Sequence, residues 1–145
     1  RGEDARPWMD PTLRVLKSGR PLLIAPEGTR SHEPGMNRAQ PGAAFIIHQA
    51  EVPVVPVGIT GTTDDFLKLA LKGKRPALGM QVGSPITLPP VEGRGEARRM
   101  ARQRNADLIM EHIAALLPDE YRGVYSNANR IEFSAQADQR QTEGG

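Results

Sequence analysis

Apolar residues at helical spacing predict four helices. Asp10-Pro11 is a favourable helix start and Gly19 a favourable helix end, so the first helix is expected between them. The same spacing predicts helices over 42–50 and 96–117, and Thr62 or Thr63 can cap a shorter one over 64–71. The residues expected to pack inward in the three longest helices are Met9, Leu13 and Leu16, then Ala43, Ala44, Ile46 and Ile47, then Met100, Ala106, Ile109, Met110, Ile113, Leu116 and Leu117.

Short apolar runs between polar turns predict the strands, over 22–25, 52–59, 77–82 and 86–88. Pro53 and Pro56 remove backbone donors from the second run, which favours an edge strand or a bulge over a regular central strand. Because strands alternate with helices along the chain, the predicted fold class is an α/β sandwich.

The two ends of the chain bear on its domain organisation. The chain begins at Arg1 without a methionine, and we interpret it as the C-terminal part of a larger domain. That part is expected to span residues 1–133. Residues 134–145 are polar, with no apolar partner for packing, and are expected to form a disordered tail.

Composition limits the classes of function. The 145 residues contain no cysteine, which excludes disulfides, thiolate metal sites and thiol nucleophiles. No run approaches the roughly 18 consecutive apolar residues that cross a bilayer. The net charge of +2 is too small to indicate a nucleic-acid partner. Fifteen arginines stand against four lysines, which reflects either a GC-rich genome or guanidinium groups placed to bind phosphate.

One polar loop carries the candidate chemistry. Pro26-Glu27-Gly28-Thr29-Arg30-Ser31 follows a predicted strand and precedes a helix, where ligands of open α/β sheets bind. Gly28 permits a positive φ, Thr29 and Ser31 offer hydroxyls, and Arg30 can clamp a phosphate. Glu27 can accept from substrate hydroxyls or orient Arg30. A plain turn with a surface Glu27–Arg30 ion pair is the alternative, and the residues alone do not separate the two.

Two segments of the sequence, one of which contains this loop, resemble conserved blocks of a known family. The segment 22–31 resembles the third conserved block of the PlsC-like glycerolipid acyltransferases, whose usual form is Phe-Pro-Glu-Gly-Thr-Arg-Ser. The run 52–57 resembles the Val-Pro-Ile-Val-Pro-Val strand of the fourth block, at the usual distance downstream. The resemblance continues through 83–86 and 121–125 and covers the chain to about residue 130. Arg1-Gly2 is similar to the end of the second block.

The resemblance implies an acyltransferase-like αβ sandwich with a mixed sheet, of which this chain is the C-terminal portion. The implied activity is transfer of a fatty acyl group from acyl-CoA or acyl carrier protein to the free hydroxyl of a lysophospholipid, such as lysophosphatidate. No metal or redox cofactor is implied, because a thioester is already activated. The acceptor would be held by Arg1, Glu27, Gly28, Thr29, Arg30 and Ser31, and the acyl-side wall would consist of Val54, Val55, Pro56 and Val57.

The family's catalytic block is absent from this chain. In His-x-x-x-x-Asp, the histidine removes the proton of the acceptor hydroxyl and the aspartate orients the imidazole. Asn37, Pro53 and Leu117 stand five residues after His32, His48 and His112, so no histidine has the required aspartate. We expect His32 to be a solvated loop residue, His48 to be structural and His112 to lie on the polar face of its helix. The catalytic pair is therefore expected upstream of Arg1; the alternative is a catalytically silent lipid-phosphate or membrane-surface module.

A second group of charges lies within and just after the short helix expected over 64–71. Lys68, Lys72, Lys74 and Arg75 form a basic cluster, which is either a solvated face, a contact for anionic lipid headgroups or a contact for phosphates of the acyl donor. The protein is expected at the cytoplasmic face of a membrane, either peripheral or anchored through an upstream segment.

Overall fold

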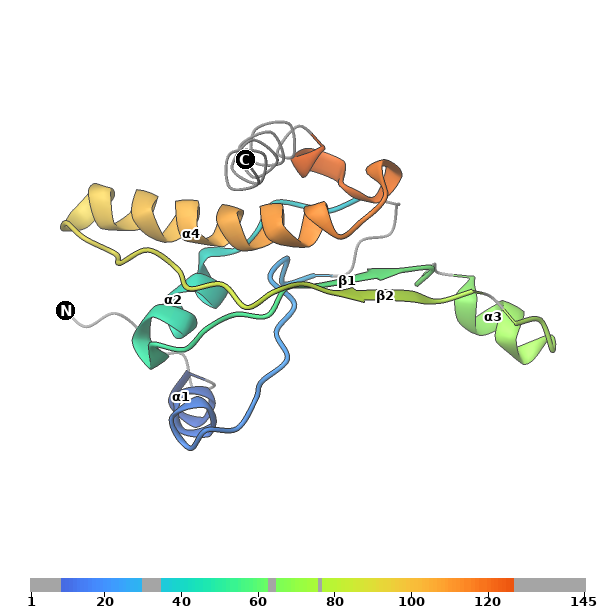
Figure 1. The fold of residues 1–145 in the computed structure, drawn as a ribbon, viewed down its shortest axis with the longest axis horizontal. Helices are drawn as coiled ribbons and strands as arrows, with labels where there is room; N and C mark the ends of the chain where they lie inside the picture. Colours follow the sequence, from blue (N-terminus) through green and yellow to red (C-terminus); the bar gives the residue numbers. More distant parts are fainter. Residues whose placement is uncertain (1–8, 30–34, 63–64, 76, 127–145) are drawn as a thin grey trace, which may run out of the picture.

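A computed structural model describes residues 9–29, 35–62, 65–75 and 77–126, and Figure 1 shows their arrangement. The elements in chain order are α1 (Met9–Lys17), α2 (Pro41–Ala50), β1 (Val57–Thr60), α3 (Phe66–Leu71), β2 (Gly79–Val82) and α4 (Gly95–Ala115), followed by the short 3₁₀ helices η1 (Asp119–Tyr121) and η2 (Gly123–Tyr125). The described residues thus combine helices with a small sheet, and the α/β class is confirmed.

The core lies between α2 and α4. All four α2 residues expected to face inward are buried, as the helical spacing predicted. In α4, Ala106, Ile109 and Met110 are buried with Ala114, and Leu117 just beyond the helix joins them. Burial of such side chains is the main favourable term in folding, so this helix pair is the stable centre of the described chain.

One expectation for α4 is wrong. Met100 is 55% exposed, because it lines a pocket and does not pack in the core. Arg102 of the same helix is half-buried and lies over the ring of Phe45 in α2, with 4.5 Å from its guanidinium carbon to the ring centroid. A guanidinium group over an aromatic face is a favourable cation–π contact, so Arg102 helps to join the two helices.

The sheet is an antiparallel pair, β1 with β2, in which Val57 is opposite Val82 and Ile59 opposite Met80. One face of the pair lies against the end of α4. A Cβ atom at Gly58 would lie 2.9 Å from Cδ2 of Leu117, closer than real side chains pack. Glycine is therefore needed at this position so that the strand and the helix can approach each other.

The proline-containing run forms a strand only in part. Val54 makes an isolated bridge with Ile86, in which each backbone amide donates to the other carbonyl at 2.8 Å. The regular ladder begins at Val57, directly after Pro56. This interruption agrees with the expectation that the prolines prevent a regular strand.

Residues 22–25 are not a strand, contrary to the prediction. Leu22 and Leu23 are exposed, the latter at 88%. A strand is defined by its ladder of hydrogen bonds to a neighbour, and no described strand pairs with this segment. The segment is instead an extended connection from α1 to the Pro26 loop.

In the described part of the chain, no helix is both long enough and apolar enough to cross a membrane. The predicted tail, residues 134–145, lies outside the described residues.

Candidate functional site

The loop that begins at Pro26 starts with a tight turn. The amide of Gly28 donates to the carbonyl of Ala25 at 3.2 Å, and Gly28 has a φ of +69°. A Cβ atom at Gly28 would also lie 3.2 Å from Cγ of Gln40. Glycine is therefore required here both for its backbone conformation and for the close packing of Gln40.

Glu27 fixes this turn to the segment that leads into α2. Its Oε2 accepts a hydrogen bond from the backbone amide of Asn37 at 2.9 Å, and the amide of Gln40 donates to the carbonyl of Pro26 at 2.9 Å. Glu27 is half-buried, whereas the hydrogen bond itself is exposed to solvent; its charged acceptor makes it stronger than a neutral one. The carboxylate thus positions the turn through the Asn37 amide, a partner that the sequence did not indicate.

The segment 36–40 is in turn fixed by residues near the end of the described chain. The buried hydroxyl of Tyr125 accepts from the amide of Ala39 at 3.0 Å and donates to Oδ1 of Asp107 at 2.8 Å. The side-chain amide of Gln103 donates both to the carbonyl of Ala39 and to Oδ1 of Asp107, each at 3.1 Å. Asp107 also lies 3.4 Å from the guanidinium of Arg38. The loop therefore rests on α4 through a continuous hydrogen-bond network.

The network and the burial of its members change the pKa of the Tyr125 phenol. Burial raises the pKa of the Tyr125 phenol to about 12; the hydrogen bond from Ala39 lowers it and the neighbouring Asp107 carboxylate raises it. The neutral phenol is thus the form that the folded chain stabilises, and it serves both as donor and as acceptor.

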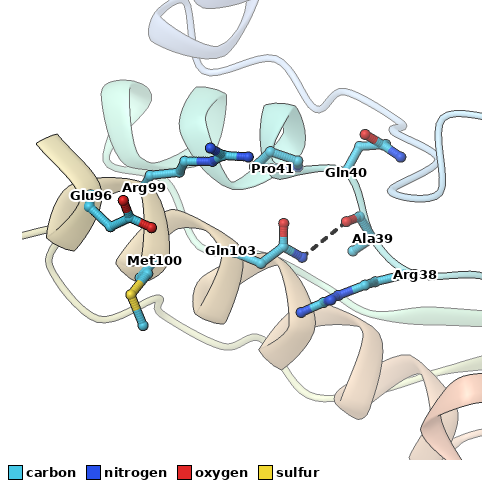
Figure 2. A pocket seen from close by; sticks show the side chains of 8 residues that line it. All are labelled: Arg38, Ala39, Gln40, Pro41, Glu96, Arg99, Met100 and Gln103. Atoms are coloured by element: carbon cyan, nitrogen blue, oxygen red, sulfur yellow. Dashed lines mark hydrogen bonds between the residues drawn. The ribbon is translucent and has the colours of Figure 1, made fainter.

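A pocket of about 570 Å³ lies beside the loop, between the segment 38–41 and the N-terminal half of α4. Its lining residues are Arg38, Ala39, Gln40, Pro41, Glu96, Arg99, Met100 and Gln103 (Figure 2). Gln40 contacts Gly28 of the loop and also lines the pocket, so the two features adjoin. Two guanidinium groups and the N-terminal end of α2 favour anionic ligands here, and the Glu96 carboxylate offsets one of the two positive charges.

The structure places only some of the predicted site residues. Glu27, Gly28 and Thr29 lie together in the turn, and Gly28 and Thr29 are exposed. Arg1, Arg30, Ser31 and His32 lie outside the described residues. The assignment of the six acceptor-binding residues therefore stays a prediction.

The residues of the predicted acyl-side wall alternate along their segment. Val54 and Val57 are half-buried, Val55 is 48% exposed and Pro56 is buried. Pro56 packs near Gly83, where a Cβ atom would lie 2.9 Å from its Cγ. This packing explains the burial of Pro56; the role of the four residues as an acyl wall stays a prediction.

The two described histidines lie in helices. His48 is half-buried in α2 and His112 is half-buried in α4. Three residues that support the loop were not predicted from the sequence: Gln103, Asp107 and Tyr125. A signal was available in part, since Gln103 and Asp107 are four residues apart and therefore share one face of α4.

The part of the chain that holds the loop also matches a known family. Residues 1–60 match the family model Acyltransferase. The matched region contains the turn at Gly28, the segment 36–40 and α2, and it supports the acyltransferase family and acyl transfer as the class of activity. No solved structure shows a significant match to the chain.

Proposed function

We propose that this chain is the acceptor-binding part of a PlsC-like glycerolipid acyltransferase. The reaction is transfer of a fatty acyl group from acyl-CoA or acyl carrier protein to the free hydroxyl of a lysophospholipid, as in the conversion of lysophosphatidate to phosphatidate. The observation that carries the proposal is the Pro-Glu-Gly-Thr-Arg-Ser loop, which lies within the Acyltransferase match. The family and the activity class rest on that match; the acceptor and the donor are proposals.

In the proposed mechanism, the loop positions the acceptor. Thr29, Arg30 and Ser31 hold the glycerol phosphate, with Arg1 as a further phosphate ligand, while Glu27 keeps the turn in place through the Asn37 amide. The neighbouring pocket, with Arg38 and Arg99, offers space and positive charge for a further anionic part of a substrate. Holding the hydroxyl against the thioester carbonyl lowers the barrier by several kcal/mol.

The proton transfers require a histidine and an aspartate upstream of Arg1. The imidazole removes the hydroxyl proton as the acceptor oxygen bonds to the thioester carbon. The carbon–sulfur bond then breaks, and the thiolate takes the proton from the imidazolium. We expect the chain of residues 1–145 alone to transfer no acyl group. The enzyme is expected at the cytoplasmic face of a membrane, without a metal or redox cofactor.

An assay of the natural full-length protein tests this proposal. Acyl transfer from labelled acyl-CoA and from acyl carrier protein to lysophosphatidate is measured for the wild type, Glu27→Ala and Arg30→Ala, with Glu92→Ala as a matched control because Glu92 is an exposed glutamate outside the loop. Each loop variant is expected to lose roughly 100-fold or more in kcat/KM, as misplacement of a substrate costs about that much. Unchanged activity in both loop variants would refute the role of the loop.

A second candidate is a catalytically silent module that binds lipid phosphates. The absence of His-x-x-x-x-Asp from residues 1–145 is the observation that favours it. The natural coding sequence separates the two: an upstream His-x-x-x-x-Asp supports the enzyme, whereas a start codon close to Arg1 supports the silent module.

A further inference from the structure

Residues 57–83 form an arm that extends from the helical core. Figure 1 shows β1 and β2 running together away from α2 and α4, with α3 at the far end. One face of the strand pair lies against the end of α4 at Gly58, as described above. The rest of the arm has no comparable cover among the described residues.

The opposite face of the arm is apolar and exposed. Because Val57 is opposite Val82 and Ile59 opposite Met80, these four side chains share the face that points away from Gly58. Met80 is 68% exposed and Val82 60%. Further along the arm, Leu71 is 81% exposed. Exposed apolar side chains gathered on one element commonly mark a site of protein or membrane contact.

The arm also carries the net charge of the chain. Residues 57–83 contain four basic residues (Lys68, Lys72, Lys74 and Arg75) and two acidic ones (Asp64 and Asp65), which gives +2. The other residues of the chain contain 15 basic and 15 acidic residues, so their net charge is zero. Lys68 forms an exposed ion pair with Asp65 at 3.3 Å. Lys72, Lys74 and Arg75 are all exposed beside Leu71.

We propose that this arm docks on the surface of an anionic lipid bilayer. The exposed apolar side chains enter the boundary between headgroups and acyl chains, while Lys72, Lys74 and Arg75 lie at the level of the lipid phosphates. Apolar contact and positive charge reinforce each other in such binding. Charge complementarity favours a membrane over a second copy of this chain, whose arm would carry the same positive charge. The proposal does not depend on the acceptor loop.

Vesicle binding by the 145-residue chain tests the charges of the arm. Sedimentation is compared for vesicles of phosphatidylcholine with and without phosphatidylglycerol, using the wild type and Lys72→Glu/Lys74→Glu. The control is Lys17→Glu/Arg20→Glu, which makes the same change of net charge at two exposed residues outside the arm. The arm variant is expected to bind anionic vesicles at least roughly 20-fold more weakly, since each lost basic residue near the surface costs about fivefold. Equal loss in the control pair would overturn the proposal.

A probe at Leu71 tests the docked face without changing any charge. Because the chain has no cysteine, Leu71→Cys and the control Val124→Cys each accept a single environment-sensitive fluorophore. Val124 is 67% exposed in η2, outside the arm. The proposal predicts a blue shift at position 71 on anionic vesicles only, reversed by salt, and none at position 124. No shift at position 71, or an equal shift at both, would contradict it.

Two further measurements test whether the arm binds the phosphates of the acyl donor or a second copy of the chain instead of a membrane. Free CoA at matched ionic strength should not displace the chain from vesicles; displacement would assign the basic cluster to phosphates of the donor. Sedimentation velocity without lipid is expected to show a monomer. A dimer of the wild type that Met80→Asp converts to a monomer would assign the apolar face to a second copy of the chain. These binding measurements contain no acyl substrate, so they are independent of the acyl-transfer assay. Vesicle binding can fail while the acyltransferase proposal holds, and acyl transfer can fail while vesicle binding is observed.

Discussion

At the scale of single residues, Tyr125 links the loop region to α4. Its hydroxyl is the shared partner of Ala39 and Asp107, and these contacts join positions 86 and 18 residues apart in the sequence. Removal of the hydroxyl leaves the Ala39 amide without this acceptor in a buried position. Leaving a buried polar group unsatisfied typically costs about 1–3 kcal/mol of stability.

Tyr125→Phe is therefore expected to lower the free energy of unfolding by about 1–3 kcal/mol near neutral pH. The pKa of Tyr125 is about 12 in the folded chain, above its ordinary value of 10.0. The folded state thus holds the phenol proton more tightly than the unfolded state, so this stabilisation is complete below pH 10 and declines between pH 10 and 12. Urea unfolding of the wild type and the variant at several pH values measures both effects.

Tyr121→Phe is the matched control, because it removes the hydroxyl of the chain's other tyrosine. Its stability difference from the wild type should be smaller than that of Tyr125→Phe at neutral pH. A difference between wild type and Tyr125→Phe that stays constant from pH 8 to pH 12 would contradict the role assigned to the Tyr125 phenol.

At the scale of elements, α4 contains residues with the same predicted orientation but different burial. Ile109 and Met100 were both expected to face inward, yet Ile109 is 2% exposed and Met100 is 55% exposed. The difference arises because Met100 lines the pocket, whereas Ile109 belongs to the core cluster with Ala44 and Ile47.

Ile109→Ala is expected to destabilise the chain by about 2–5 kcal/mol, through lost burial and the cavity that remains. Met100→Ala should change stability by less than about 0.5 kcal/mol, as is usual for exposed positions. Denaturant unfolding monitored by far-UV circular dichroism gives both values. Similar losses in the two variants would show that Met100 packs in the core after all.

The helices and the loop show which features of the fold could be predicted from the sequence and which could not. The inward face of α2 was predicted correctly, because helical spacing depends only on local geometry. The run 22–25 was not, because a strand needs a neighbour and apolar composition does not supply one. The positive φ of Gly28 was predicted correctly, because a tight turn favours glycine at such a position. The supports of the loop, Gln103 and Asp107, were missed because polar residues on a helix resemble a solvated face until the fold brings Ala39 and Tyr125 to them.

At the scale of the whole molecule, the chain divides into a packed core and a thinly supported arm. α4 packs on α2 and is joined at its end by Arg122, whose Nε donates to the carbonyls of Ala114 and Leu117 at 3.0 and 2.9 Å. The arm has a two-stranded ladder and a helix of six residues. Two-stranded ladders and short helices are marginally stable alone.

Hydrogen exchange should therefore separate the two parts. Amides in peptides that cover 57–83 are expected to exchange at least roughly 100-fold faster than those of α4 from Asn105 to Ala115, because exchange follows local opening where packing is sparse. On addition of anionic vesicles, exchange in 57–83 should slow while that of α4 stays constant, because only the arm is held by the lipid. Mass spectrometry of peptic fragments resolves both regions. Equal exchange in the two parts without lipid would mean that the arm is as firmly held as the core, and protection of α4 alone would place the lipid contact elsewhere.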